Sequence, residues 1–288
     1  MAIYRRRYRT SSGAVTAGRF RFLVFTRYAA RQLFASKLFA LYFAGCFGAP
    51  LVGAAIIYLH FNPLGIKALK TTVDELLTID GGFFLRFLVI QTGLGSVLAA
   101  LVGPGLIAPD LANNAMPLYL SRPVTRRDYI LGKLAVLVGI MSVLTWIPIL
   151  LLFALQSLLA GWGWFATNLP IAFGILGGSA LWIAVVSLLT LAVSAWVRWR
   201  PVATLAVFGY FFISAAIGTL IDEILVTTWG SVLNVAKLMR FLWSPFFGVP
   251  AIDEALPLPV AAVAVLLTCA VFLAMLVRRV CAYEVVRR

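Results

Sequence analysis

The chain has 288 residues, of which 62% are hydrophobic and only 12% are charged. Soluble domains average roughly 45–50% apolar and about 25% charged residues, so this chain has too few charges to cover a globular surface in water. Intrinsic disorder is excluded as well, because a chain with this much apolar surface buries it. The class that remains is an integral membrane protein.

Uncharged stretches long enough to cross a bilayer, about 20 residues each, predict six membrane-spanning helices. The stretch 134–197 is long enough for two helices, and turn signals between Gln156 and Pro170 divide it. The other predicted spans are 38–59, 87–109, 201–221 and 255–277. The sequence therefore predicts an all-α integral membrane fold.

Lysine and arginine are distributed unequally among the segments that join these spans. Of the 24 basic residues, 19 lie in the N-terminal segment, the loops after the second and fourth spans, and the C-terminal tail. The opposite side holds the other five, which are Lys67, Lys70, Arg86, Lys237 and Arg240. Because cytoplasmic segments are enriched in Lys and Arg, both termini are predicted to be cytoplasmic in a multi-pass protein of the inner (plasma) membrane. The same rule explains the net charge of +14 without a nucleic-acid partner.

The chain is predicted to have three parts: a basic cytoplasmic N-terminus (1–37), a six-helix transmembrane domain (38–281) and a cytoplasmic tail (282–288). In the N-terminal part, Arg19, Arg27 and Arg31 are mixed with aromatic residues. This pattern predicts an interfacial helix on the cytoplasmic leaflet. A plain basic tail and an arginine-rich mitochondrial presequence are the alternatives.

The predicted spans contain essentially no ionisable side chain, and the only histidine, His60, lies at the outer end of the first span. Ion-coupled transport requires such groups at membrane depth. Intramembrane hydrolysis requires a base beside its nucleophile, and no phosphate-binding G-x-x-x-x-G-K-[ST] loop occurs. We therefore expect no enzymatic activity, no metal and no cofactor bound by this chain, so that energy for uphill transport would come from another polypeptide.

Several small residues and prolines inside the spans predict close packing and bends. Pro50, Pro104 and Pro148 each lie within a span, where neighbouring helices can satisfy the freed carbonyl groups. Gly174 and Gly178 have the G-x-x-x-G spacing that permits close helix contact, either within the chain or between two chains.

The loop after the second span carries the most specific pattern. Asp110 lies at the predicted membrane boundary, and a short helix is predicted to follow it, ending before Pro123. Thr125 is predicted to cap the next helix with Asp128 three residues further on. A short helix beneath the membrane with a basic rim suits docking to a cytoplasmic partner, whereas the alternative is a basic loop that only fixes topology.

These residues resemble the ABC-2 type permeases, the membrane subunits of a class of ATP-binding-cassette exporters. Six spans, cytoplasmic termini and an interfacial helix support the resemblance over essentially the whole chain. The motif itself consists of Asp110, the run LYLSRP at 118–123, Arg126, Asp128, Tyr129, Gly132 and Lys133.

The resemblance implies a permease subunit of an exporter, driven by a separate ABC ATPase that binds ATP and Mg²⁺. In the family this loop contains a coupling helix that rests on the ATPase. The resemblance therefore implies partner contacts by Asp110, Leu118, Tyr119, Arg122, Pro123, Arg126, Arg127 and Asp128. It also implies a second permease copy, or a related permease, within the lipid bilayer.

Two uncharged runs between the fifth and sixth spans, 224–236 and 241–252, are too short to cross a membrane. They predict re-entrant or interfacial pieces, as in ABC-2 permeases, with an ordinary outer loop as the alternative. The candidate outer-gate residues are Asp222, Glu223, Trp229 and Trp243, the tryptophans being predicted interfacial aromatics.

A second function compatible with the loop is a membrane scaffold that recruits a cytoplasmic partner without transporting anything. A membrane-embedded transferase or protease is the weakest hypothesis, because the catalytic residues are missing. The composition of the spans does not identify a substrate.

The predicted topology can be tested with reporter fusions along the chain. Fusions at Thr72 and Ser231 are expected to score external, and fusions at Asn114 and Val286 internal, because the basic segments stay in the cytoplasm. A reversed result at any of the four positions contradicts the topology.

Overall fold

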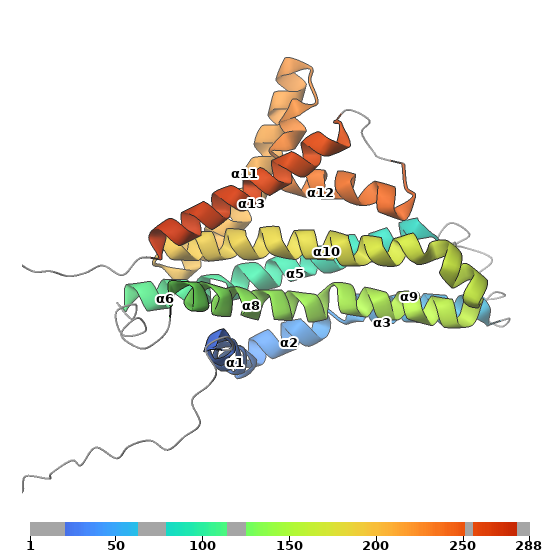
Figure 1. The fold of residues 1–288 in the computed structure, drawn as a ribbon, viewed down its shortest axis with the longest axis horizontal. Coiled ribbons are helices and arrows are strands. Elements are labelled where there is room, and N and C mark those ends of the chain that lie inside the picture. Colours follow the sequence, from blue (N-terminus) through green and yellow to red (C-terminus); the bar gives the residue numbers. More distant parts are fainter. Residues whose placement is uncertain (1–20, 63–78, 114–124, 251–255, 281–288) are drawn as a thin grey trace, which may run out of the picture.

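The computed structural model describes residues 21–62, 79–113, 125–250 and 256–280, which form helices joined by short turns (Figure 1). Within these residues, six helical stretches are long and apolar enough to cross a membrane. They are Lys37–Phe61, Gly81–Ala112, Arg126–Ala160, Trp162–Trp196, Arg200–Leu225 and Leu258–Arg279. The prediction of six spans in an all-α fold is confirmed.

Three of the spans are built from two consecutive helices separated by a short interruption. These pairs are α2 (Lys37–Gly45) with α3 (Gly48–Phe61), α5 (Gly81–Val102) with α6 (Pro104–Ala112), and α8 (Arg126–Leu144) with α9 (Trp146–Ala160). Pro50, Pro104 and Pro148 each lie within the first three positions of the second helix in a pair. The backbone N–H at such a position has no partner inside the helix, so proline is tolerated there. These prolines lie where the spans divide into two helices, and the predicted bends stay a prediction.

The helix α10 (Trp162–Trp196) is the centre of the bundle. It packs against α5, α6, α8, α9, α11 (Arg200–Leu225) and α13 (Leu258–Arg279). In Figure 1, α5, α10 and the consecutive pair α8 and α9 run along the long axis, whereas α11 projects from the bundle at a steep angle. Three short helices lie between α11 and α13: η2 (Trp229–Val232), α12 (Val235–Trp243) and η3 (Ser244–Phe247).

The second span begins earlier than the uncharged run predicted. Asp80 caps α5, its Oδ1 accepting a hydrogen bond from the backbone N–H of Phe83 at 2.9 Å, and the helix starts at Gly81. The predicted start at residue 87 is therefore wrong. As a consequence, Arg86 lies within α5 and not in a loop.

The turn between the third and fourth spans is much shorter than predicted. Only Gly161 separates α9 from α10, with φ of +91°, a conformation that side chains with a Cβ rarely adopt. Asn168 and Pro170, which were predicted to belong to the turn, lie inside α10. The Asn168 side chain donates to the carbonyl of Trp164 at 2.9 Å and so follows the helix.

The glycine pair on α10 provides a close contact within this chain. A Cβ added at Gly178 would lie 2.8 Å from the indole ring of Trp243, and one at Gly174 would lie 2.7 Å from the Cβ of Phe246. Both partners belong to the segment between α11 and α13. The glycines therefore allow this segment to rest directly on α10.

The substitution Gly178→Leu should destabilise the bundle by about 1–3 kcal/mol, because Trp243 has to move to admit the new side chain. The matched control is Gly177→Leu, since Gly177 is exposed and has no neighbour within 4 Å of an added Cβ. Thermal unfolding in detergent, followed by circular dichroism, measures the difference. Equal melting temperatures for the two variants would contradict the packing described here.

Candidate functional site

The carboxylate of Asp110 joins the end of the second span to the start of the third. Its Oδ2 accepts a hydrogen bond from the Tyr129 hydroxyl at 2.7 Å and lies 2.9 Å from the Nζ of Lys133. Tyr129 is fully buried, and the side chains of Lys133 and Asp110 are only 12% and 17% exposed. Water screens an ion pair weakly at such burial. These three residues, called the loop anchor below, hold the end of α6 against the start of α8, on either side of the segment 113–125.

A second contact fixes α6 to the central helix. The Oγ of Ser194 on α10 accepts from the backbone N–H of Ala108 at 3.0 Å and donates to the carbonyl of Pro104 at 3.1 Å. The hydroxyl thus inserts between two groups that an uninterrupted helix would pair with each other. Gly103 permits this approach, because a Cβ there would lie 2.6 Å from the Cβ of Thr190. The helix that enters the loop is therefore tied to both α8 and α10.

The third span begins with the predicted cap. The Thr125 hydroxyl oxygen accepts from the backbone N–H of Asp128 at 3.2 Å, and the Asp128 carboxylate accepts from the backbone N–H of Thr125 at 3.0 Å. This reciprocal arrangement is a capping box, and it confirms the prediction. The next two residues, Arg126 and Arg127, are exposed at the start of α8. The loop thus leads into a rigid helix end with two arginines on its surface.

The N-terminal helix α1 (Arg21–Phe34) packs against α8. The Thr26 hydroxyl donates to the carbonyl of Gly132 at 3.1 Å, next in the chain to Lys133 of the loop anchor. Ala29 is buried in this contact region, whereas Arg27 and Arg31 are exposed. The helix therefore covers the stretch of α8 that carries the loop anchor and presents its arginines away from the bundle. Its location at a lipid interface stays a prediction.

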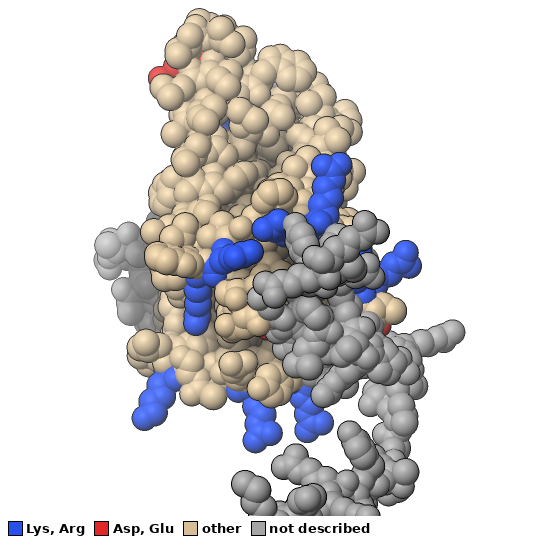
Figure 2. Space-filling view, turned by 90° about the vertical axis from the view of Figure 1, so that its left-hand side faces the viewer, with Lys and Arg blue, Asp and Glu red and all other residues tan. Residues whose placement is uncertain are grey.

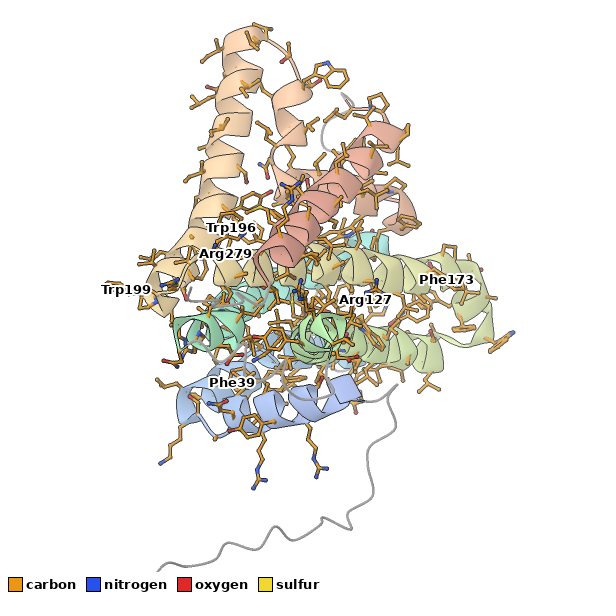
Figure 3. All side chains as sticks on the ribbon, turned by 60° about the vertical axis from the view of Figure 1, so that its left-hand side comes forward. Phe39, Arg127, Phe173, Trp196, Trp199 and Arg279 are labelled. Atoms are coloured by element: carbon orange, nitrogen blue, oxygen red, sulfur yellow. The ribbon has the colours of Figure 1, made fainter. Side chains whose placement is uncertain are left out.

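Basic side chains gather at the end of the bundle where α6 ends and α8 begins. Figure 2 shows this end, with several lysine and arginine side chains and few acidic ones among the described residues. Arg279 of α13 lies 5.5 Å from the centroid of the Trp196 ring of α10, and Figure 3 shows the two side by side. Exposed basic residues here are Arg27, Arg31, Lys37, Arg126, Arg127, Arg198, Arg200 and Arg278.

The structure brings part of the predicted partner-binding set together. Asp110, Arg126, Arg127 and Asp128 lie at this basic end, beside the helix that carries Arg27 and Arg31. Their contact with a partner stays a prediction. The other predicted residues, which are Leu118, Tyr119, Arg122, Pro123 and Arg19, lie outside the described residues.

At the opposite end, Asp222 organises the segment between α11 and α13. Its carboxylate accepts from the backbone N–H of Gly230 at 2.7 Å and from the Ser231 hydroxyl at 2.9 Å, and it lies 4.0 Å from the Nζ of Lys237. Gly218 and Gly230 allow the backbones to meet, since a Cβ at Gly218 would lie 2.6 Å from the Gly230 carbonyl oxygen. Asp222 therefore fixes η2 and α12 to the end of α11.

The remaining outer-gate candidates occupy different environments. Glu223 and Trp229 are exposed, the latter at 62%. Trp243 is only 3% exposed, and its ring centroid lies 6.0 Å from that of Trp182 on α10. The prediction that Trp243 is an interfacial aromatic is wrong, because the bare backbone at Gly178 makes room for its ring inside the bundle. The gating role of these residues stays a prediction.

Among the described residues, no three His, Cys, Asp or Glu side chains come close enough to hold a metal ion.

A sequence model of the ABC-2 family transporter proteins matches residues 20–279, nearly the whole chain. The chain belongs to this family. Family membership makes it the membrane permease component of an ABC transporter and implies an ABC ATPase as a partner. A comparison with curated proteins found no match.

Some of the residues that build this end of the permease were missed as site residues. Tyr129 and Lys133 stood in the family-like motif, but they were not assigned a role. Their spacing of four residues, which places both on one helix face near Asp110, is a signal that could have paired them with it. Ser194 carries no comparable signal, because its partners on α6 are far away in the sequence.

A double-mutant cycle on the permease tests the loop anchor. Asp110→Asn and Lys133→Gln should each lower the free energy of unfolding. The loss in the double variant should be smaller than the sum of the two single losses by about 1–2 kcal/mol. The coupling arises because each single change leaves a largely buried charge without its partner. Chemical unfolding in mixed micelles measures the free energies. Additive effects would show that the two side chains do not interact.

Proposed function

We propose that this permease is part of an ABC exporter and that a cytoplasmic ATPase docks on its basic end. The loop anchor is the observation that carries the proposal. Because it joins the exit of α6 to the entry of α8, a force on the loop between them acts on two spans together. Through Ser194 the same force reaches α10, the central helix. A loop held in this way can transmit the closing of an ATPase pair to the bundle.

The charge distribution supports the proposed orientation of the permease in the membrane. The basic end carries the loop anchor, the N-terminal helix and the end of α13, so both termini would face the cytoplasm. The exposed arginines of α1 and α8 would then flank the docked ATPase and the anionic headgroups of the inner membrane. Export as the direction of transport follows from the resemblance to family exporters.

The helix α11 supports assembly with a second permease, either another copy or a related chain. Only 11% of its most apolar stretch is buried, compared with 56% for α10. Leu205, Phe212 and Ile213 are among its exposed apolar residues, at 69%, 74% and 59%. A helix that leaves its own bundle in this way can build a transport pathway with the matching helix of its partner (Figure 1).

The proposal can be tested by purifying the permease with the ABC ATPase encoded beside it. Arg126→Glu combined with Arg127→Glu should lower the amount of co-purified ATPase by about 10-fold, because two exposed cations are replaced by anions at the dock. The control is Thr167→Glu, which adds an anion at the far end of α10. Unchanged co-purification of the double variant would contradict docking at this end.

The ATP hydrolysis rate of the same complex distinguishes a driven permease from a scaffold. In a driven permease, Tyr129→Phe should lower the ATP hydrolysis rate of the assembled complex several-fold without releasing the ATPase, since the hydroxyl bond to Asp110 is part of the transmission. A scaffold predicts equal hydrolysis rates for the wild type, the variant and the free ATPase. The permease purified alone should hydrolyse no nucleotide.

A further inference from the structure

A cavity of about 1070 Å³ opens between α5, α11 and α12, at the end of the bundle opposite the loop anchor. This volume is slightly above the range of small-molecule sites, roughly 300–1,000 Å³. One wall is a stripe of α5 residues at helical spacing, which are Gly82, Leu85, Arg86, Val89 and Ile90. The facing wall is the α12 side formed by Ala236, Lys237, Arg240 and Phe241.

The cavity is cationic on one part of its lining. Arg86, Lys237 and Arg240 are three of the five basic residues on the predicted outer side of the protein. Outer segments contain few basic residues. Three of the five on this side nevertheless line the same cavity. The Nζ of Lys237 lies 4.0 Å from the carboxylate of Asp222, which stands at the end of α11. Arg86 and Arg240 are exposed, and neither forms an ion pair with a carboxylate of the described residues.

The acidic residue among the described lining is already engaged. Asp80 accepts the hydrogen bond from the backbone N–H of Phe83 that caps α5. This single carboxylate is outnumbered by Arg86, Lys237 and Arg240, so the described lining keeps a net positive charge. Arginine is the side chain best suited to bind phosphate, because its planar group donates two parallel hydrogen bonds.

The rest of the lining is apolar. Leu85, Val89 and Ile90 of α5, Phe241 of α12 and Ala215 of α11 extend the cavity away from the arginines. On α11 the lining residue is Ala215, and Phe212, one turn before it on the same side of the helix, is an exposed apolar residue at 74%. A free phosphate ion would leave these walls in contact with water. A molecule with an anionic head and a hydrocarbon chain covers both parts.

We propose that this cavity binds an anionic phospholipid, with its phosphate at Arg86 and Arg240 and an acyl chain along the α5 and α11 walls. The shared chemistry is a phosphate group, and the apolar walls favour the lipid over the free ion. The inference goes beyond the proposed function, from which it takes only the orientation that places the cavity in the outer leaflet. Its test uses the purified permease without an ATPase, so the two proposals fail separately.

Calorimetric titration of the full-length permease in a neutral detergent tests the site. The probes are dioctanoyl phosphatidylglycerol, dioctanoyl phosphatidylcholine and sodium phosphate. The test variant is Arg86→Gln combined with Arg240→Gln, and the charge-matched control is Lys37→Gln combined with Arg198→Gln, two exposed basic residues away from the cavity. A second variant, Ala215→Leu, narrows the cavity without changing its charge.

The wild type should bind phosphatidylglycerol at least ~10-fold more tightly than phosphatidylcholine or phosphate. The arginine variant should lose at least ~10-fold in affinity for phosphatidylglycerol, and the control variant less than about 2-fold. Ala215→Leu should weaken binding of the lipid and leave the thermal unfolding of the protein unchanged.

Three results would overturn the proposal. Equal losses in the arginine and control variants would show binding by general surface charge. Equal affinities for the two lipids would show an apolar groove that does not recognise the phosphate charge. Phosphate binding as tight as that of phosphatidylglycerol would show a site for free anions.

Discussion

A single carboxylate shared by a buried tyrosine and a nearly buried lysine joins the end of α6 to the start of α8 at the basic end of the bundle. Asp110 can hold this position only because both of its partners stand on one face of α8, four residues apart. A charge removed from water in this way requires its counter-charge, and the requirement fixes the end of α6 against the start of α8. The hydrogen bond of Thr26 joins α1 to the same stretch of α8, and that of Ser194 joins α10 to α6. Four helices thus share one junction at the basic end.

The rest of the bundle is organised around α10, whose small residues let other elements approach closely. Gly174 and Gly178 admit the side chains of η3 and α12, and Thr190 faces the bare backbone of Gly103. In a membrane such packing replaces the hydrophobic driving force that is absent between helices in lipid. The helix α11 lies outside this tightly packed part, with little of its apolar surface buried. The molecule therefore has a packed body and one projecting helix (Figure 1).

The sequence was sufficient for features set by local chemistry. Uncharged runs located all six spans. The Thr125 cap, and the division of three spans near Pro50, Pro104 and Pro148, agree with rules about backbone N–H groups. Features set by contacts between distant residues were not accessible. The burial of Trp243 depends on Gly178, on a different helix, and nothing near Trp243 in the sequence indicates it.

Charge patterns predicted the start of the second span wrongly, and the sequence did not identify all the residues of the loop anchor. Counting uncharged residues placed Arg86 outside the second span, whereas the Asp80 cap extends α5 past it and puts the arginine on a cavity wall. At the loop, the family resemblance included Tyr129 and Lys133 in its motif but assigned them no role beside Asp110. Their roles become visible only when α6 and α8 are placed side by side.

The most direct test of the account is a pair of distances measured by electron–electron resonance on the assembled transporter. Spin labels at Arg27 and Leu131, in a background without native cysteines, report the junction of α1 with α8, and labels at Leu131 and Leu205 relate α8 to α11. When the ATPase binds a non-hydrolysable ATP analogue, the first distance should stay constant and the second should change. A changed first distance with a constant second one would contradict a junction that moves as one body.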